Sequence, residues 1–279
     1  MRFYKLSGAG NDFIILDGIR ETLPEGRFPD MAQILCERHM SLGADGLMVV
    51  QPSDKADFRM AFYNSDGSVG EMCGNGARCI CRYGYETGLS GETQTVETAS
   101  GVVTGRRIDK RNYRVRLTEP TLVRPDFPIE IDGRRFNCAY VELGDPGLPH
   151  AVVPMPGLRE CDENALFELG QKIRRHPAFP KGANVNFYDF IGRNHIYERT
   201  FERGVEGFTY ACGTGTASVA LILTLRGEAR GESFRADMRG GRLFVNVERE
   251  GQSVTGLYLI GPTNIVAVGE ILDEELNIK

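Results

Sequence analysis

The chain lacks several features on which common classes of protein depend. Its 279 residues include no tryptophan, only four histidines and no Cys-x-x-Cys pair. The one cluster of cysteines, at positions 73, 79 and 81, does not have a spacing usual for zinc, so we expect no metal site. No apolar run approaches the ~18 residues that a membrane span needs. The first residues, MRFYKLSGAGNDF, contain no apolar core of a signal peptide, and we expect a cytoplasmic protein.

Motifs for nucleotide cofactors are also absent. The stretch GAGNDF (8–13) begins as Gly-x-Gly but lacks the third glycine of a dinucleotide loop, and no P-loop occurs. The net charge of −5, with no run of basic residues, argues against a nucleic acid or an acidic membrane as a partner. We therefore expect chemistry without a cofactor, on a small molecule.

The composition that remains is that of an ordinary globular protein, 41 % hydrophobic and 25 % charged. The length predicts two domains, each long enough to bury its own core. The seven cysteines are odd in number, and a chain of this length does not need disulfides, so reduced thiols are expected.

One short device occurs twice in the chain. EMCGNGARC (71–79) and YACGTGTAS (210–218) each have a cysteine, then Gly-x-Gly, then a run that can enter a helix. Aligning them puts Cys73 on Cys212, an offset of 139 (212 − 73). The same offset puts Asn11 on His150, Asp45 on Asn184 and Asn64 on Arg203, and RLTEPT (116–121) matches YLIGPT (258–263) at an offset of 142. These matches favour an internal duplication over chance similarity of glycine-rich turns.

The duplication sets the expected domain boundaries and fold. Prolines 120, 125 and 128 punctuate the chain after LTEP, so the first half is predicted as 1–119 plus 264–279 and the second as 120–263. The tail after Pro262 is expected to return to the first half as an extra strand. Most other segments alternate or are β-branched, as strands are. One helix follows each cysteine, at 76–89 and 216–229, each ending at a glycine, with further helices at 29–41 and 162–175. The prediction is an α+β protein of two pseudo-symmetric, β-rich halves, each around a central helix.

The two cysteines at helix starts indicate a specific chemistry. A helix start offers unpaired backbone N–H groups and a positive dipole, and glycines let a carboxylate approach them. The same field should lower the pKa of both thiols below ~8.5. If the two helix starts share one amino-acid carboxylate, one thiolate can remove the α-proton and the opposite thiol can reprotonate the other face. Such a pair would invert a stereocentre.

Two other readings remain open from these residues. Cys73 with His150 could form a Cys–His hydrolase, although that leaves the matching Cys212 without a role. A carboxylate-binding protein without catalysis is the other, since helix starts bind anions without reacting. The remaining cysteines are expected to be small core residues; they are Cys36, Cys79, Cys81, Cys138 and Cys161.

Six motifs, in order, closely resemble the diaminopimelate epimerase family: GAGNDF, FYNSDGS, CGNGARC, GANVNF, ERGVE and ACGTG. The resemblance runs from about residue 3 to the C-terminus. It implies two pseudo-symmetric halves, each a barrel-like sheet around a central helix. It also implies pyridoxal-independent conversion of LL- to meso-diaminopimelate, in the synthesis of lysine and cell-wall precursors. Homodimers fit the family as well.

The resemblance assigns roles residue by residue. Cys73 and Cys212 would be the acid–base pair, with His150 paired to the first and Glu202 to the second. Arg203 would hold the distal carboxylate of the substrate, where a bidentate guanidinium fits. The remaining substrate-binding positions would be Asn11, Asn64, Gly74, Asn75, Asn184, Gly213 and Thr214.

Three positions depart from the family pattern. Leu148 stands where an asparagine often contacts the distal end, Phe208 replaces a common glutamate, and Gly46 replaces a glutamine of some members. A racemase of another amino acid, histidine for example, is therefore the alternative. Diaminopimelate stays the favoured substrate because Asn64, Asn184 and Arg203 are all retained.

Overall fold

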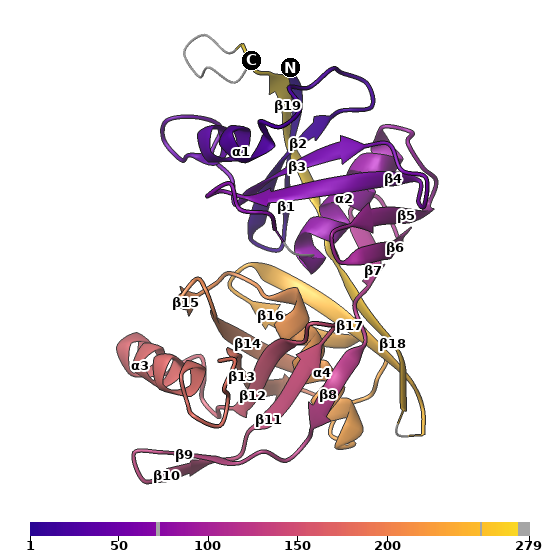
Figure 1. Ribbon diagram of the computed structural model, residues 1–279. Coiled ribbons are helices and arrows are strands. Elements are labelled where there is room, and N and C mark those ends of the chain that lie inside the picture. Colours follow the sequence, from indigo (N-terminus) through magenta and orange to yellow (C-terminus); the bar gives the residue numbers. More distant parts are fainter. Residues whose placement is uncertain (71–72, 252, 273–279) are drawn as a thin grey trace. The chain divides into compact units, whose positions relative to one another are not determined.

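The computed structural model describes residues 1–70, 73–251 and 253–272, and its chain divides into two compact units (Figure 1). Unit 1 is Met1–Val115 with Gly261–Lys279, and unit 2 is Arg116–Ile260. We predicted boundaries after residues 119 and 263. In the structure the boundaries between the units fall after residues 115 and 260. The chain thus leaves unit 1, builds unit 2 and returns.

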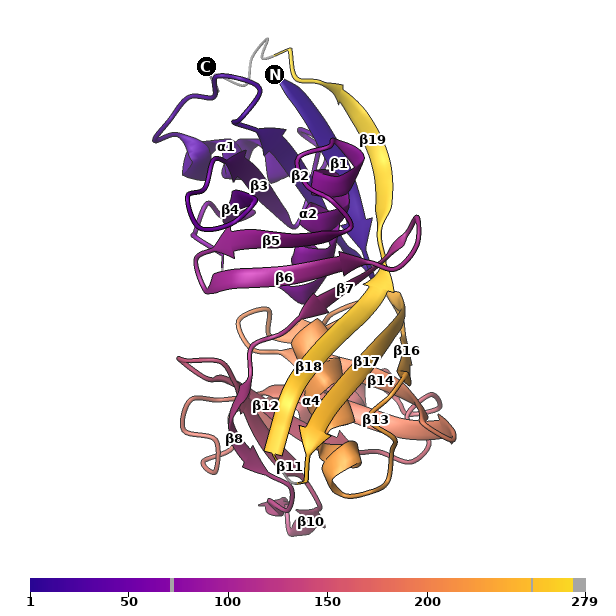
Figure 2. The same ribbon diagram turned by 90° about the vertical axis from the view of Figure 1, so that its right-hand side faces the viewer.

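Unit 1 is a mixed sheet in the order β19-β1-β2-β3-β4-β5-β6-β7. The tail of the chain forms the outer strand β19, which pairs antiparallel with β1 and places Ala267 opposite Lys5 (Figure 2). The strands are β1 (Arg2–Gly8), β2 (Asn11–Asp17), β3 (Gly46–Gln51), β4 (Phe58–Asn64), β5 (Thr93–Thr98), β6 (Gly101–Arg107), β7 (Asn112–Arg116) and β19 (Asn264–Glu270).

Unit 2 has a sheet in the order β8-β11-β12-β13-β14-β16-β17-β18, with the two-residue β15 also paired to β14. A separate hairpin is formed by β9 (Ile129–Ile131) and β10 (Arg134–Phe136). The other strands are β8 (Pro120–Arg124), β11 (Ala139–Leu143), β12 (Leu148–Pro154), β13 (Asn184–Gly192), β14 (His195–Glu202), β15 (Gly207–Phe208), β16 (Phe234–Met238), β17 (Gly241–Glu250) and β18 (Ser253–Pro262).

The two sheets repeat the same series of pairings. In unit 1 the parallel pairs are β2/β3 and β4/β5, and in unit 2 they are β12/β13 and β14/β16. Every other neighbour is antiparallel, including the outer strands β19 on β1 and β8 on β11. The outer strand of unit 2, β8, follows β7 of unit 1 in the chain, and the outer strand of unit 1, β19, follows β18 of unit 2. An internal duplication in which the last strand of each repeat joins the sheet of the other unit produces this pattern.

Helices occupy equivalent places in both units. The outer helices α1 (Phe28–Cys36) and α3 (Glu163–Arg174) pack on β3 and β4 and on β13 and β14, respectively. The central helix α2 (Gly74–Glu86) packs against β1, β2, β5 and β6, and α4 (Gly213–Leu225) against β11, β12, β13 and β17. The predicted fold class is confirmed. In the part of the chain that the structure describes, no helix has the length and apolarity to cross a membrane.

The central helices end at Glu86 and Leu225, three and four residues before the predicted ends at 89 and 229, and they begin earlier than predicted. Gly88 and Gly227 follow them with φ of 72° and 74°, left-handed conformations that favour glycine. Backbone bonds from Leu89 N to Gly84 O and from Glu228 N to Leu223 O close both ends in the same way. The helices start at residues 74 and 213, rather than 76 and 216, because the glycines after each cysteine are themselves helical.

The prediction of a helix over 29–41 was too long. Helix α1 ends at Cys36, because Glu37 is extended (φ −61°, ψ 119°) and His39 has a positive φ of 76°. The apolar residues of the predicted segment explain the end point, since Met31, Ala32, Leu35 and Cys36 are buried and nothing after them is. The helix predicted at 162–175 is α3, which begins after the N-cap Asp162, whose carboxylate accepts from Ala165 N at 2.9 Å.

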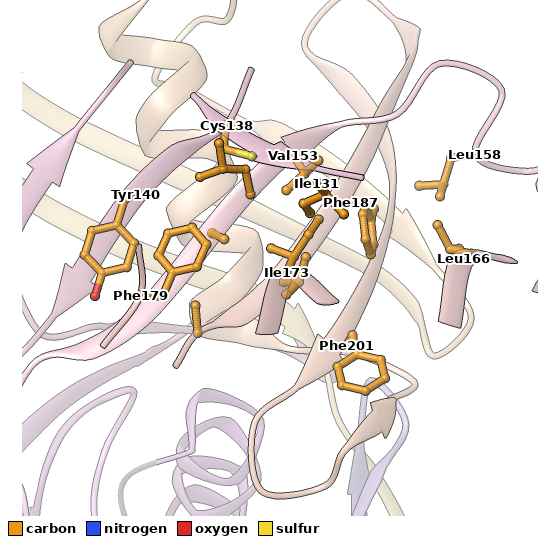
Figure 3. Close-up of a cluster of buried hydrophobic side chains, with 14 residues drawn as sticks. Ile131, Cys138, Tyr140, Val153, Leu158, Leu166, Ile173, Phe179, Phe187 and Phe201 are labelled. Carbon is orange, nitrogen blue, oxygen red and sulfur yellow. The ribbon is translucent and has the colours of Figure 1, made fainter. Parts of the chain in front are cut away.

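The core of unit 2 lies between α3 and the sheet (Figure 3). Phe187 on β13 and Phe201 on β14 are fully buried there, and Ile173 packs onto them from α3. Tyr140 and Phe179 stack with ring centroids 5.3 Å apart. This layer holds β12, β13 and β14 in place, and the functional side chains of unit 2 project from the other face of these strands.

We expect Phe187→Ala to lower the free energy of unfolding by about 3–5 kcal/mol, because a fully buried ring leaves a cavity. Phe190, on the same strand but 43 % exposed, supplies the matched control, and Phe190→Ala should cost under ~1 kcal/mol. Urea denaturation monitored by circular dichroism measures both. Equal losses in the two variants would contradict this account of the core.

Candidate active site

The start of α2 forms the candidate half-site of unit 1. Cys73 is the N-cap residue, in an extended conformation (φ −105°, ψ 123°), and the first intrahelical bond runs from Ala77 N to Cys73 O at 2.8 Å. The N–H groups of Gly74 and Asn75 precede that bond, so the helix itself gives them no acceptor. They are available to an anion at the helix start.

A chain of hydrogen bonds fixes the amides beside this helix start. Arg78 donates to Asn75 Oδ1 (2.8 Å), and Asn75 Nδ2 donates to Asn11 Oδ1 (2.7 Å). Asn11 Nδ2 in turn donates to Asp45 Oδ2 (3.0 Å), whose other oxygen accepts from Arg38 at 2.9 Å. Each bond determines which end of the next amide faces which way. Asn11 and Asn75, both predicted for the site, are thus held in one orientation.

Arg78 is a fully buried cation behind Cys73. Its guanidinium also donates to Gly74 O at 3.2 Å, and within the described residues no carboxylate forms an ion pair with it. Burial lowers the pKa of Arg78 to about 10, while the thiols of Cys79 and Cys73 act in the opposite direction. A buried charge without a counter-ion is costly. A negative charge on a neighbouring thiol would reduce that cost.

The other predicted positions of unit 1 lie at the strand ends. Asn64 ends β4, and its amide donates to Ser68 Oγ at 2.9 Å within the following turn. At Gly46 an added Cβ would lie 2.4 Å from the ring of Phe62 and 2.7 Å from Tyr63 O. The aromatic ring therefore explains why no longer side chain stands at this position.

The start of α4 repeats the arrangement in unit 2. Cys212 is the N-cap residue, again extended (φ −123°, ψ 105°), and Thr216 N donates to its carbonyl oxygen at 2.9 Å. The Cys212 Sγ atom lies 3.5 Å from Thr214 Oγ1. Gly213 and Thr214 take the places of Gly74 and Asn75.

The predicted lowering of the pKa of Cys212 is wrong, because this pKa is raised. Burial raises this pKa well above the ordinary value, and the carboxylates of Glu202 and Glu198 add to the effect. The contact with Thr214 opposes the rise without cancelling it. Desolvation and like charge thus outweigh the field of the helix start, and Cys212 is a protonated thiol at neutral pH.

His150 is fully buried and neutral. Burial and the charge of Arg203 lower its pKa to about 3, although the bond with Asn186 opposes this. Asn186 Nδ2 lies 3.3 Å from His150 Nδ1 and donates to Ala151 O at 3.0 Å, so Nδ1 is the acceptor and Nε2 carries the proton. The Nε2 atom has no hydrogen-bond partner among the residues described. A neutral N–H donor without an acceptor suits a ligand better than a core position.

Glu202 ends β14, and Arg203 follows it beside Asn184. Glu202 accepts from Thr209 Oγ1 at 2.8 Å and acts electrostatically on Cys212. The backbone N–H of Arg203 donates to Asn184 Oδ1 at 2.8 Å, and its guanidinium donates to Lys181 O at 2.9 Å. The remaining guanidinium donors can hold a further anion. Unit 2 therefore brings together His150, Asn184, Glu202, Arg203 and the Cys212 helix start, while Cys73 and its neighbours belong to unit 1.

Two of the positions that depart from the family pattern, Phe208 and Leu148, lie in unit 2. The ring of Phe208 packs on Phe201 (centroids 5.6 Å apart) and Phe187, and the guanidinium of Arg199 lies 4.2 Å from its centre. Phe208 thus extends the hydrophobic core. Leu148 begins β12 opposite Leu143, where an apolar side chain has replaced a common amide.

Several polar residues near the helix starts were not predicted. Asn186, Glu198 and Thr216 are buried within unit 2, and Arg78 and Asp45 serve unit 1. Asn186 could have been found, because it follows Asn184 by two residues and so shares its face of the strand. Glu198 could not, since the alternation of HIYERTFER does not tell which face is buried.

Comparisons with known proteins identify the family of the chain. The family model "Diaminopimelate epimerase" matches residues 3–123 and 144–266. The chain belongs to the diaminopimelate epimerase family. It is 36 % identical to diaminopimelate epimerase of Methanothrix thermoacetophila over 99 % of this chain and 98 % of that protein. Identity to the enzyme of Leptospira biflexa is 34 %, over 97 % and 99 % of the two chains. As a member of this family the chain is an isomerase, with amino acid epimerase or racemase activity.

Solved structures share the fold at lower identity. A probable proline racemase from Agrobacterium radiobacter K84 aligns with a TM-score of 0.69 and 18 % identity, over 99 % of this chain and 95 % of that one. A hydroxyproline epimerase from Agrobacterium vitis aligns equally well, at 0.69 and 19 %, over 99 % and 94 %. These likenesses establish the fold.

The equivalent glycines of the two helix starts differ in what surrounds them, and this gives a test. A Cβ at Gly215 would lie 2.0 Å from Asn186 Oδ1, while one at Gly76 would meet the flexible Met48 Cε at 2.6 Å. We expect Gly215→Ala to displace Asn186 and reduce epimerisation at least about tenfold. Gly76→Ala should be milder, because the methyl can move and alanine favours the helix by about 1 kcal/mol. Steady-state rates measure both; a larger loss in Gly76→Ala would contradict the role given to Asn186.

Proposed function

We propose that the protein converts LL-diaminopimelate to meso-diaminopimelate without a cofactor, using Cys73 and Cys212 as acid and base on opposite faces of one α-carbon. The observation that carries the proposal is the repeated device: in each unit a cysteine caps the central helix at the same position of the same sheet pattern. The names of the relatives at 34–36 % identity support the substrate. Pyridoxal would have no part in this reaction.

Backbone N–H groups stabilise the proposed intermediate. Removing the α-proton leaves negative charge that spreads onto the α-carboxylate. Gly74 and Asn75 in unit 1, and Gly213 and Thr214 in unit 2, offer N–H groups to that carboxylate. Each well-placed donor is worth roughly 3 kcal/mol at a developing charge. The bond from Asn75 Nδ2 to Asn11 Oδ1 holds the side chain of Asn75 in place beside one of the two sets.

The surroundings of the two thiols favour opposite proton states. Buried Arg78 interacts with Cys73 and lacks a carboxylate partner among the described residues, so a thiolate at Cys73 would provide its counter-charge. Cys212 is buried and faces the carboxylate of Glu202, and both effects favour the thiol. We therefore assign Cys73 as the base and Cys212 as the acid of the resting enzyme.

The proton balance of one turnover follows from this assignment. The Cys73 thiolate takes the α-proton and becomes a thiol, while the Cys212 thiol gives its proton to the opposite face and becomes a thiolate. The substrate is inverted and the enzyme is left in the reverse state, which can process the other stereoisomer. Glu202 acts on Cys212, and His150, neutral with a free Nε2–H, would donate a hydrogen bond near the first thiol or the substrate.

Asn64, Asn184 and Arg203 would hold the distal amino-acid end of diaminopimelate, with Arg203 on its carboxylate. Leu148 is the specific observation that favours another substrate, because an apolar side chain at a common amide position removes a donor. A racemase of histidine or another amino acid is the second candidate. Cytoplasmic location and a homodimer stay predictions.

Cys73→Ala and Cys212→Ala should each reduce epimerisation by about 10²–10⁴-fold, the usual contribution of a positioned acid or base. The control is Cys161→Ala, which removes a half-buried thiol of unit 2 away from both helix starts and should keep full activity. Circular dichroism checks that all three fold. Full activity in either helix-start variant would exclude the two-thiol scheme.

The substrate is tested with purified protein, several L-amino acids including LL-diaminopimelate, no added cofactor, and chiral separation of products. Turnover of LL-diaminopimelate alone supports the proposal, and turnover of histidine instead supports the second candidate. In deuterated water the inverted α-carbon should carry solvent deuterium. Retention of the original hydrogen would contradict exchange through thiols.

A further inference from the structure

Glu198 is a buried carboxyl group that the proposed reaction leaves without a role. It lies in the middle of β14 and is 2 % exposed. Its Oε2 atom accepts from Thr216 Oγ1 at 2.7 Å, and its Oε1 atom has no hydrogen-bond partner among the described residues. None of the ion pairs in the described part of the chain involves it. An ionised carboxylate here would be a nearly unpaired buried charge, which strongly favours the protonated acid.

The hydroxyl of Thr216 connects Glu198 to Cys212. Thr216 Oγ1 lies 2.7 Å from Glu198 Oε2 and 3.0 Å from Cys212 O, but it has only one proton. When Glu198 is protonated, its O–H can donate to Thr216, and Thr216 can donate to the Cys212 carbonyl. When Glu198 is ionised, the Thr216 proton turns to the carboxylate and the carbonyl loses this donor. The charge of Glu198 thus determines whether Thr216 donates a hydrogen bond to the carbonyl oxygen of Cys212.

The other groups on this face of the sheet do not neutralise Glu198. Tyr188 lies directly opposite it on β13, and burial raises the pKa of Tyr188 to about 12. His150, from β12, is neutral. Cys212, at the start of α4, is protonated, and Glu202 on the same strand is a second acid. No cation faces Glu198 from these described elements.

The charged residues of β16 lie on the opposite face. Arg235 and Asp237 alternate with the buried Phe234, Ala236 and Met238, so they point away from α4. Asp237 is paired there with Arg235 at 2.7 Å. On β17 the side chains that alternate inward, Leu243 and Val245, are apolar.

We propose that Glu198 is a positioning residue for Cys212, acting through Thr216, and that its neutral form keeps the thiol able to exchange its proton. The inference rests on the proposed role of Cys212 as an acid–base group. Loss of the Glu198 proton adds a negative charge beside the thiol and removes the Thr216 bond to the Cys212 carbonyl. Both changes make the thiolate harder to form.

The helix of unit 1 carries other residues at the positions that match Thr216 and its neighbour. The offset of 139 places Thr216 on Ala77 and Ala217 on Arg78. One unit therefore carries a buried cation in the first turn of its central helix, and the other carries a hydroxyl bonded to a buried acid. The difference is specific to the surroundings of the two cysteines.

The test measures alkylation of Cys212 by iodoacetamide between about pH 6 and about pH 9.5, with the labelled peptide quantified by mass spectrometry, since the rate follows the thiolate fraction. Burial raises the pKa of Glu198 to about 8. Below that pH, wild type and Glu198→Gln should react alike, because the group is neutral in both. At about pH 9.5 Glu198→Gln should react about tenfold faster, one pKa unit of the thiol.

Two further variants make the outcome specific. Thr216→Val removes the donor to the Cys212 carbonyl at every pH and the proton that stabilises an ionised Glu198. It should therefore react more slowly than wild type below about pH 8, and the difference should close toward about pH 9.5. The double variant should react as Thr216→Val does. Glu250→Gln removes an exposed carboxylate of β17 in the same unit and should leave the curve unchanged. If Glu198→Gln does not fold, as judged by circular dichroism, Thr216→Val alone decides.

Superimposable alkylation curves in wild type, Glu198→Gln and Thr216→Val would overturn the inference. An alkylation rate changed by the same factor at every pH would overturn it as well, because such a change does not depend on the charge of Glu198. The readout needs no turnover, so a shifted curve in a protein that does not epimerise diaminopimelate would reject the proposed substrate and keep the role of Glu198. In an active enzyme, kcat/KM for epimerisation should fall above about pH 8 in wild type and at higher pH in Glu198→Gln.

Discussion

The N–H groups at the starts of α2 and α4 are the constraint on which the rest of the structure depends. They cannot be paired within the helix, and the N-cap residue of each helix is a cysteine in extended conformation whose side chain makes no capping bond to them. An anion can reach them only if nothing bulky follows the cysteine. A Cβ at Gly215 would also lie 2.0 Å from Oδ1 of the buried Asn186, whereas one at Gly76 would meet only the flexible end of Met48 within 3 Å. The strands around each central helix serve to hold this close approach, because β12 and β13 position Asn186 and its partner His150.

The duplicated frame holds two different electrostatic environments. Strand pairing, helix placement and helix ends repeat in both units. The buried polar residues do not, since Arg78 stands behind Cys73 while Glu198 and Glu202 act on Cys212. Backbone geometry is shared because it is set by sheet register and glycines. Charge is free to differ, because one substitution in the first turn of a helix changes it without disturbing the register.

The sequence predicted the fold well where local signals are strong. The alternating or β-branched segments were expected to be strands, and two of them, NDFIILD and FRMAFYN, form β2 and β4. The glycines after the central helices mark where these helices end. The predicted end of the first helix, at residue 41, was wrong because His39 takes a positive φ that no local rule predicts. The prediction that the pKa of Cys212 is lowered was also wrong. Helix position can be read from the motif, but burial and the approach of Glu198 depend on strand pairing across the sheet, which the sequence does not display.

Unequal halves suit the proposed reaction for a physical reason. Inversion at one carbon needs one thiol with a proton and one without at the same moment. Two identical environments would give both thiols the same pKa, so that neither would be favoured as the donor and states with two thiols or two thiolates would compete. A buried cation on one side and buried acids on the other remove this degeneracy. The difference in pKa between the two thiols must stay moderate, however, because the reverse reaction needs the thiolate at Cys212 and the thiol at Cys73. An acid such as Glu198, which can itself lose a proton, therefore adjusts the second thiol more gently than a fixed charge would.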